Sequence, residues 1–201
     1  MNATPHDESD SQFSATFERL ILGSELVALL DEIAGHPYMD EAVDQRTHAL
    51  QTAELAAASH ADDELIIAAA LHDIGRASSV RSAYPELAHE EAGGVFVRTR
   101  ATSRMAWIIE QHVPAKRYLV ACDPNYTSQL SPTSVTTLAR QGGPMSPAEV
   151  ERFRQHPWHD AALTLRRWDD AAKDPERVGM SIPELLETFE RWKQQIRTTR
   201  P

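Results

Sequence analysis

The segment from residue 62 to residue 72 constrains the fold of this chain more than any other feature of the sequence. It begins with Asp62 and Asp63, which suit the N-cap and first turn of a helix, and continues as ELIIAAALH. Because its apolar residues point to every side, such a helix is stable only when other elements surround it. We therefore predict a buried central helix over 62–72, with Gly75 as its C-terminal cap.

Apolar residues recur at helical spacing through most of the remaining chain. Phe13, Phe17, Leu20, Val27 and Leu30 fall on one face of a helix. Further helices are predicted over 41–59, 86–98, 102–113, 131–141, 147–155, 158–173 and 182–197, and no segment alternates for long enough to indicate a strand. The sequence predicts an all-α fold, with a disordered polar tail over 1–11 and a single domain over 12–201.

The amino-acid composition argues against several classes of protein. The chain of 201 residues carries 20 Lys and Arg against 30 Asp and Glu, so it has no surplus of cations with which to neutralise nucleic-acid phosphates. The single Cys122 excludes a disulfide framework and a cysteine-based zinc site. The N-terminal residues are polar and the longest apolar run, 65–71, is too short to span a membrane. We expect a cytoplasmic protein that binds neither nucleic acid nor membrane, of unknown oligomeric state.

A histidine and a carboxylate, His72 and Asp73, follow directly after the apolar run. A charged carboxylate in an apolar interior is costly unless it is paired or bound to a metal ion. Imidazole nitrogen and carboxylate oxygen are good ligands for iron, manganese or zinc. The alternative is structural: Asp73 caps a helix and His72 donates to a backbone carbonyl. The pair alone leaves both interpretations open.

The order of histidines and aspartates along the chain is more informative than the pair. It resembles the HD-domain superfamily of all-helical metalloproteins, which implies a helical bundle with the metal site between its central helices. Two further histidines lie between the last two members of the pattern. The resemblance implies six metal ligands, enough for two metal ions bridged by Asp73: His48, His72, Asp73, His89, His112 and Asp169.

The segments around these ligands resemble one branch of that superfamily. They are residues 38–43 (YMDEAV), 112–119 (HVPAKRYL), 130–137 (LSPTSVTT), 141–145 (QGGPM) and 166–173 (RRWDDAAK). Together they resemble the mixed-valent diiron oxygenases that cleave organophosphonates. The resemblance implies two iron ions, Fe(II) and Fe(III), with O2 as co-substrate. Asp169 is preferred to Asp170 as the ligand, because it stands four residues before Lys173, as in related diiron oxygenases.

The same resemblance implies how a phosphonate is held. Lys116 and Arg166 would bind its oxygens, together with the hydroxyl groups of Ser134 and Thr137. Tyr38 and Glu41 would lie at the other end of the substrate and bind an ammonium group. One position departs from the family pattern, because Arg76 stands where the family usually has a histidine that contacts the phosphonate.

The implied reaction is O2-dependent cleavage of the carbon–phosphorus bond of a 1-hydroxyalkylphosphonate. A 2-amino- or 2-trimethylammonio-1-hydroxyethylphosphonate would yield phosphate and glycine or glycine betaine. The alternative enzyme is a metal-dependent phosphohydrolase that acts on a nucleotide or phosphate ester, in which the metals activate water. A third interpretation is an inactive HD module that binds a phosphorylated effector. The complete set of candidate ligands argues against this last one.

Overall fold

The computed structural model describes residues 22–38 and 41–198, and across these residues the chain is helical. The long helices are α2 (Gly23–Glu32), α3 (Gln45–Ala58), α4 (Asp63–Leu71), α6 (His89–Arg98), α7 (Ser103–Glu110), α8 (His112–Cys122), α9 (Pro132–Arg140), α10 (Pro147–Arg154), α11 (His159–Ala171) and α12 (Ile182–Thr198). Three shorter elements complete the described part of the fold. They are the α-helix α5 (Ser78–Ala83) and the 3-10 helices η1 (Ile74–Arg76) and η2 (Thr127–Gln129). Within those ranges no strand forms, and an isolated bridge joins Pro37 to Asp44. The predicted all-α fold is confirmed.

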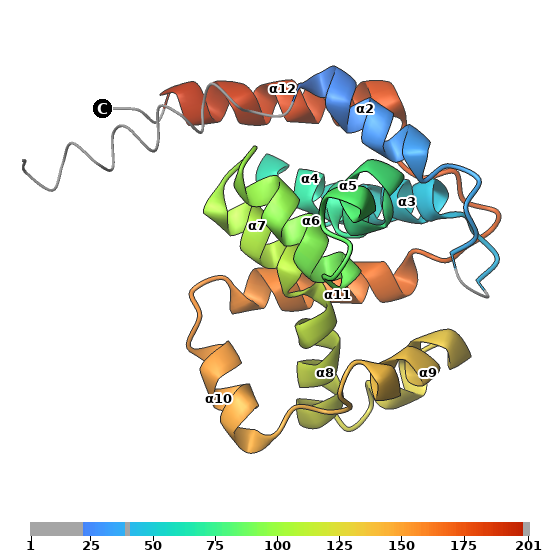
Figure 1. Cartoon of the computed structure of the whole chain (residues 1–201), viewed down its shortest axis with the longest axis vertical. Coiled ribbons are helices and arrows are strands. Elements are labelled where there is room, and N and C mark those ends of the chain that lie inside the picture. Colours follow the sequence, from blue (N-terminus) through green and yellow to red (C-terminus); the bar gives the residue numbers. More distant parts are fainter. Residues whose placement is uncertain (1–21, 39–40, 199–201) are drawn as a thin grey trace, which may run out of the picture.

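Helix α4 is the central helix, as the apolar segment predicts. Every residue from Leu65 to Leu71 is buried, with no more than 7% of its surface exposed. The helix packs against α3, α7, α11 and α12, which surround it. In Figure 1, α2 and α12 lie on one side of this central group, and α8, α9 and α10 form the opposite end of the molecule.

Helix α4 ends earlier than expected, at Leu71 rather than beside Gly75. The chain then enters the single turn η1, in which Gly75 is buried. A Cβ atom on Gly75 would lie 1.8 Å from the carbonyl oxygen of His89. The glycine is therefore needed for a close approach of two backbones, and the predicted role as a helix cap is wrong.

A second correction concerns residues 102–113, which were expected to form one helix. The structure divides them, because α7 ends at Glu110 and a new helix, α8, begins at His112. The prediction ended the helix at residue 113, directly before Pro114. Proline is well tolerated in the first turn of a helix, because the N–H that it lacks would have no acceptor within the helix there. Pro114 thus marks the beginning of α8. The short helix α5 was also not predicted.

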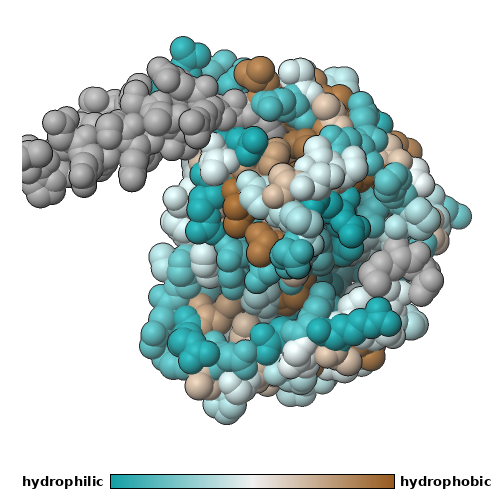
Figure 2. All heavy atoms as spheres, in the orientation of Figure 1, coloured by the Kyte–Doolittle hydropathy of each residue, from teal (hydrophilic) through white to brown (hydrophobic). Residues whose placement is uncertain are grey.

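Several expectations lie outside the described residues: the boundary between tail and domain at residues 11 and 12, and the helical face formed by Phe13, Phe17 and Leu20. The face of the molecule in Figure 2 is mainly hydrophilic, with smaller apolar patches between the polar side chains. In the part of the chain that the structure describes, no helix combines the length and the apolar character that crossing a membrane requires.

Candidate metal centre

The six predicted metal ligands come from five segments that meet between the helices. They are His48 in α3, His72 directly after α4, Asp73 before η1, His89 at the start of α6, His112 at the start of α8 and Asp169 in α11. The side chain of His89 is 18% exposed, and those of the other five are at most 2% exposed. The structure therefore brings all six together in one buried centre.

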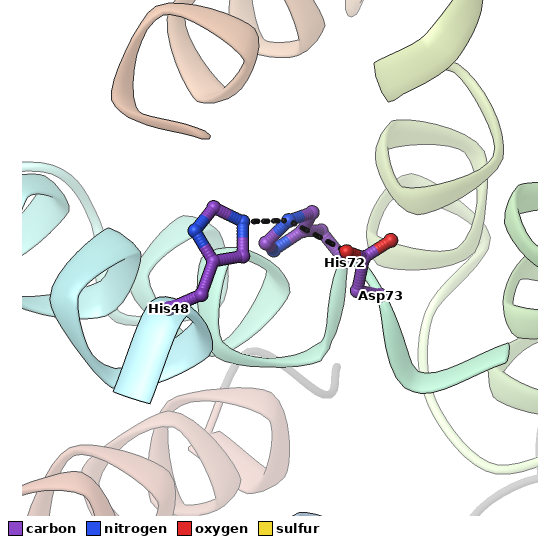
Figure 3. A group of neighbouring side chains, drawn as sticks. All are labelled: His48, His72 and Asp73. Carbon is purple, nitrogen blue, oxygen red and sulfur yellow. Dashed lines mark hydrogen bonds and ion pairs between the residues drawn. The ribbon is translucent and has the colours of Figure 1, made fainter. Parts of the chain in front are cut away.

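One half of the centre is formed by His48, His72 and Asp169. The Nε2 atom of His48 lies 3.1 Å from Nε2 of His72 and 3.3 Å from Oδ1 of Asp169. His72 Nε2 is 3.9 Å from Oδ2 of the same carboxylate. Figure 3 shows the rings of His48 and His72 turned toward each other, with the carboxylate of Asp73 on the far side of His72.

The other half is formed by Asp73 with His89 and His112. Oδ1 of Asp73 lies 3.0 Å from His89 Nε2 and 3.6 Å from His112 Nε2. Its other oxygen, Oδ2, lies 3.8 Å from His72 Nε2. Asp73 therefore belongs to two groups whose spacing suits a metal ion, one with His48 and His72 and one with His89 and His112. This position suits a carboxylate that bridges two metal ions.

The second nitrogen of each histidine is held by a hydrogen bond away from the centre. Nδ1 of His48, His72 and His112 lies 2.7–2.8 Å from the carbonyl oxygens of Ala172, Ala69 and Ile109, respectively. In His89, Nδ1 lies 2.9 Å from a carboxylate oxygen of Glu90. A carbonyl can only accept, so Nδ1 of the first three rings donates, and Nε2 is the nitrogen left to bind a metal ion. Such partners commonly orient histidines that bind metal ions.

The centre has the character of a site that needs cations. The Nε2 atoms of His48 and His72 lie 3.1 Å apart, and two imidazole lone pairs at this distance are favourable only with a proton or a cation between or beside them. Within the described residues, neither oxygen of buried Asp73 accepts a hydrogen bond of good geometry. Imidazoles and carboxylates in this number suit two transition-metal ions with nitrogen and oxygen ligands. The residues present fit the implied group.

Charges in the centre favour the ligating forms of most of these groups. Burial acts to raise the pKa of Asp73, but Arg76 and the neighbouring histidines hold it well below its usual range. Burial likewise lowers the pKa of His112 to about 3 and lowers that of His72. His89 differs, because the Asp73 carboxylate outweighs the effect of burial and raises its pKa. The carboxylate of Asp73 and the imidazoles of His72 and His112 are thus favoured in the forms that bind a metal ion.

A pocket opens directly onto this centre. It is lined by all seven residues that the sequence predicts to bind substrate, and these are Tyr38, Glu41, Arg76, Lys116, Ser134, Thr137 and Arg166. Asp73, His89, His112 and Asp169 also line it. The pocket therefore joins the candidate metal ligands to a group of cationic and hydroxyl side chains.

Arg166 is buried and tightly held between two carboxylates. Its Nη1 donates to Oδ2 of Asp169 at 2.7 Å, and its other nitrogens bond to Asp170. Tyr126 contacts both Arg166 and Asp170 through its hydroxyl group. The sequence favoured Asp169 over Asp170 as the ligand. In the structure Asp170 has an indirect role, because it positions the arginine that supports Asp169.

Glu41 and Tyr38 lie at the pocket as expected, with a partner that the sequence interpretation missed. The ammonium group of Lys173 lies 3.2 Å from Oε1 of Glu41 and 5.7 Å from the centre of the Tyr38 ring. It also donates to the hydroxyl groups of Ser131 and Ser134. Tyr38 stacks on His48 and donates to Asp169. The spacing of Lys173 was used to choose Asp169 as the ligand, but no role of its own was predicted for Lys173.

Lys116 extends from α8 to the start of α9. Its Nζ donates to Thr137 Oγ1 at 2.9 Å and to the carbonyl oxygen of Ser134 at 3.4 Å. Three of the predicted phosphonate-binding residues are therefore already in contact. The remaining described histidines do not line this pocket. His36 and His60 are exposed, and His156 and His159 pack beside Trp107 and Phe153; His6 is outside the described residues.

Comparison with known proteins agrees with this geometry. The HD domain family model matches residues 46–142, which include five of the six candidate ligands. The chain is 40% identical over 159 residues to the hydroxymethylphosphonate dioxygenase of Gimesia maris, covering 76% of this chain and 78% of that protein.

Two other relatives have comparable coverage. The [1-hydroxy-2-(trimethylamino)ethyl]phosphonate dioxygenase (glycine-betaine-forming) of Leisingera caerulea is 34% identical, over 78% of this chain and 81% of the relative. The uncharacterized protein L432 of Acanthamoeba polyphaga mimivirus is 32% identical, over 74% and 71%. The chain belongs to the HD-domain oxygenase family that contains these phosphonate dioxygenases.

Proposed function

We propose that this protein is an O2-dependent oxygenase that cleaves the carbon–phosphorus bond of a 1-hydroxyalkylphosphonate, releasing phosphate and a carboxylate. The observation that carries the proposal is the shared position of Asp73 between two histidine pairs, next to a pocket with four cationic side chains. The names of two relatives, both phosphonate dioxygenases, support the same activity. The exposed free thiol of Cys122 is compatible with action in the cytoplasm.

The two metal ions are proposed to be iron, Fe(II) and Fe(III). His48, His72 and Asp169 would hold one ion, His89 and His112 the other, and Asp73 would bridge them. When bound, the pair would activate O2 and accept a substrate hydroxyl and a phosphonate oxygen. The protein supplies orientation: each imidazole is fixed by its Nδ1 partner, and Asp169 is fixed by Arg166 and Tyr38.

Substrate binding is proposed to use the cations and hydroxyl groups of the pocket. Lys116 would pair with the phosphonate, and Ser134 and Thr137 would donate hydrogen bonds to it. Arg166 would contribute its positive charge, although both ends of its guanidinium are occupied by Asp169 and Asp170. Its main task would be to stabilise the ligand carboxylate.

A metal-dependent phosphohydrolase is the alternative, since it would share the HD ligands. The residues outside the ligand set favour the oxygenase, because Tyr38, Glu41 and Lys116 join the pocket in the manner that the oxygenase resemblance implies. The two activities differ in their need for O2. Phosphate release from hydroxymethylphosphonate and from 2-amino- and 2-trimethylammonio-1-hydroxyethylphosphonate, measured with and without O2, tests the proposal. Release that is independent of O2 would favour the hydrolase.

The pH dependence of kcat/KM gives a test of Lys116. Burial and the charge of Arg166 lower the pKa of Lys116 to about 8. A lowered pKa means that the ammonium group is lost as the pH rises through this value, so phosphonate binding should weaken above it. We expect kcat/KM to fall about tenfold per pH unit well above pH 8. In Lys116→Arg, whose side chain stays charged, this limb should move to higher pH; an unchanged limb would assign it to another group.

Glu41→Gln tests recognition of the substrate amine. If Glu41 binds an ammonium group, removing its charge should lower kcat/KM about 10- to 150-fold for an amine-bearing hydroxyphosphonate, the equivalent of about 1.5–3 kcal/mol. Hydroxymethylphosphonate, which has no amine, should be affected much less. Equal losses on both substrates would mean that Glu41 acts only by holding Lys173, and the assigned role would be wrong.

A further inference from the structure

Arg76 makes contacts that the proposed function leaves unexplained. Its Nε atom lies 3.1 Å from Asp73 Oδ1, and its Nη2 atom lies 3.1 Å from His89 Nε2. These are the two ligand atoms that stand 3.0 Å apart in the second half of the metal centre. The guanidinium therefore faces the same carboxylate oxygen and the same imidazole nitrogen that a second metal ion would need.

Arg76 and a second metal ion would compete for the same oxygen of Asp73 and the same nitrogen of His89. His89 Nε2 has at most one lone pair, and it cannot give that pair both to an N–H of Arg76 and to a metal ion. Arg76 is charged at any working pH, so a divalent cation beside it is repelled. The contacts of Arg76 with Asp73 are also incomplete, because its Nε makes no hydrogen bond of good geometry there. The guanidinium is held mainly by charge.

Arg76 also borders open space outside the candidate metal centre, into which its side chain can move. Its side chain is 27% exposed, whereas that of Asp73 is 1% exposed. It lines the pocket that contains Lys116 and Ser134, and it lines a neighbouring pocket with Arg81, Tyr84 and His89. A bound phosphonate in the first pocket would offer the guanidinium a new anionic partner.

We propose that Arg76 and the second metal ion compete for Asp73 and His89, and that a bound phosphonate relieves this competition by drawing Arg76 into the pocket. Substrate binding and completion of the metal pair are thereby coupled. The proposal rests on the proposed function for the identity of the anion. By thermodynamic linkage, the second metal ion must strengthen phosphonate binding by the same factor.

The test is an anaerobic titration of the metal-free protein with Fe(II), in which bound metal is measured after equilibrium dialysis. Arg76→Gln should tighten the weaker of two binding steps by about 5- to 150-fold and leave the stronger step unchanged. Arg81→Gln is the matched control, because Arg81 lines the neighbouring pocket but makes no contact with a candidate ligand in the described part of the chain. It should behave as the unmodified protein.

A second titration, with hydroxymethylphosphonate present, tests the coupling. The phosphonate should tighten the weaker step more in the unmodified protein than in Arg76→Gln, since direct ligation of the metal by substrate would help both equally. If Arg76→Gln does not fold by circular dichroism, Arg76→His serves instead and should give the same result. A weaker step that is unchanged or loosened in a folded variant would overturn the proposal, because Arg76 would then support Asp73.

The titration with Fe(II) alone requires neither O2 nor turnover. A tightened second step without O2-dependent phosphate release would therefore leave the competition intact and reject the proposed oxygenase. O2-dependent phosphate release together with an unchanged second metal-binding step in Arg76→Gln would reject the competition and leave the proposed oxygenase intact.

Discussion

Asp73→Ala should reduce bound iron from about two ions per chain to less than one and abolish turnover. Asp73 is the one residue placed in both candidate metal groups, so its loss removes a ligand from each ion at once. Among the described residues neither of its oxygens accepts a hydrogen bond of good geometry, and its close partners, Arg76 and His89, pair with it through charge. Elemental analysis after purification and O2-dependent phosphate release measure the two effects.

Asp160→Ala is the control for this substitution. Asp160 belongs to α11, like Asp169, but its side chain is 87% exposed and pairs with His159, which is not a candidate ligand. Iron content and turnover should stay unchanged. An Asp73→Ala protein that retains two ions and normal activity would remove Asp73 from the metal centre.

Arg166→Gln should lower the free energy of unfolding by about 3–5 kcal/mol, because it leaves the carboxylates of Asp169 and Asp170 without their buried counter-charge. The pKa of Asp169 shows the same dependence. Burial acts to raise it, and Arg166 is the main group that holds it well below its usual range. Urea denaturation of the metal-free protein measures the loss without a contribution from bound iron.

The neighbouring Arg167 provides a control in the same helix. Its side chain is 50% exposed and its ion pair with Asp123 is long, at 3.4 Å. Arg167→Gln should change the unfolding free energy by no more than about 0.5 kcal/mol. A similar small change for Arg166→Gln would mean that the two carboxylates find other partners, and the supporting role of Arg166 would be rejected.

The sequence predicted the central helix because Asp62 and Asp63 suit the start of a helix and the segment 65–71 that follows has no polar face. Its end could not be predicted, because Gly75 suits a helix cap as well as the close backbone contact that the structure contains. Pro114 was misleading for a similar reason, since proline is compatible both with the end of one helix and with the first turn of the next.

The predicted site residues depended on a pattern of types and order, and the structure brings them together. The groups that position these site residues could not be predicted from the sequence in the same way. Three histidines bond to backbone carbonyls, which no side-chain pattern encodes. The ion pair between Lys173 and Glu41 joins residues far apart in the chain, and so does the contact between Tyr126 and Asp170. Such pairings follow from the packing of helices.

The backbone contact at Gly75 has a consequence for the geometry of the candidate metal centre. Gly75 follows Asp73 by two residues, and it touches the backbone of His89, the first residue of α6. Gly93, one turn later in α6, lies against it as well. Direct contact between two backbone segments thus holds the main chains of two candidate ligands, Asp73 and His89, close together. Any side chain at position 75 would force these segments apart, and with them the two candidate ligands.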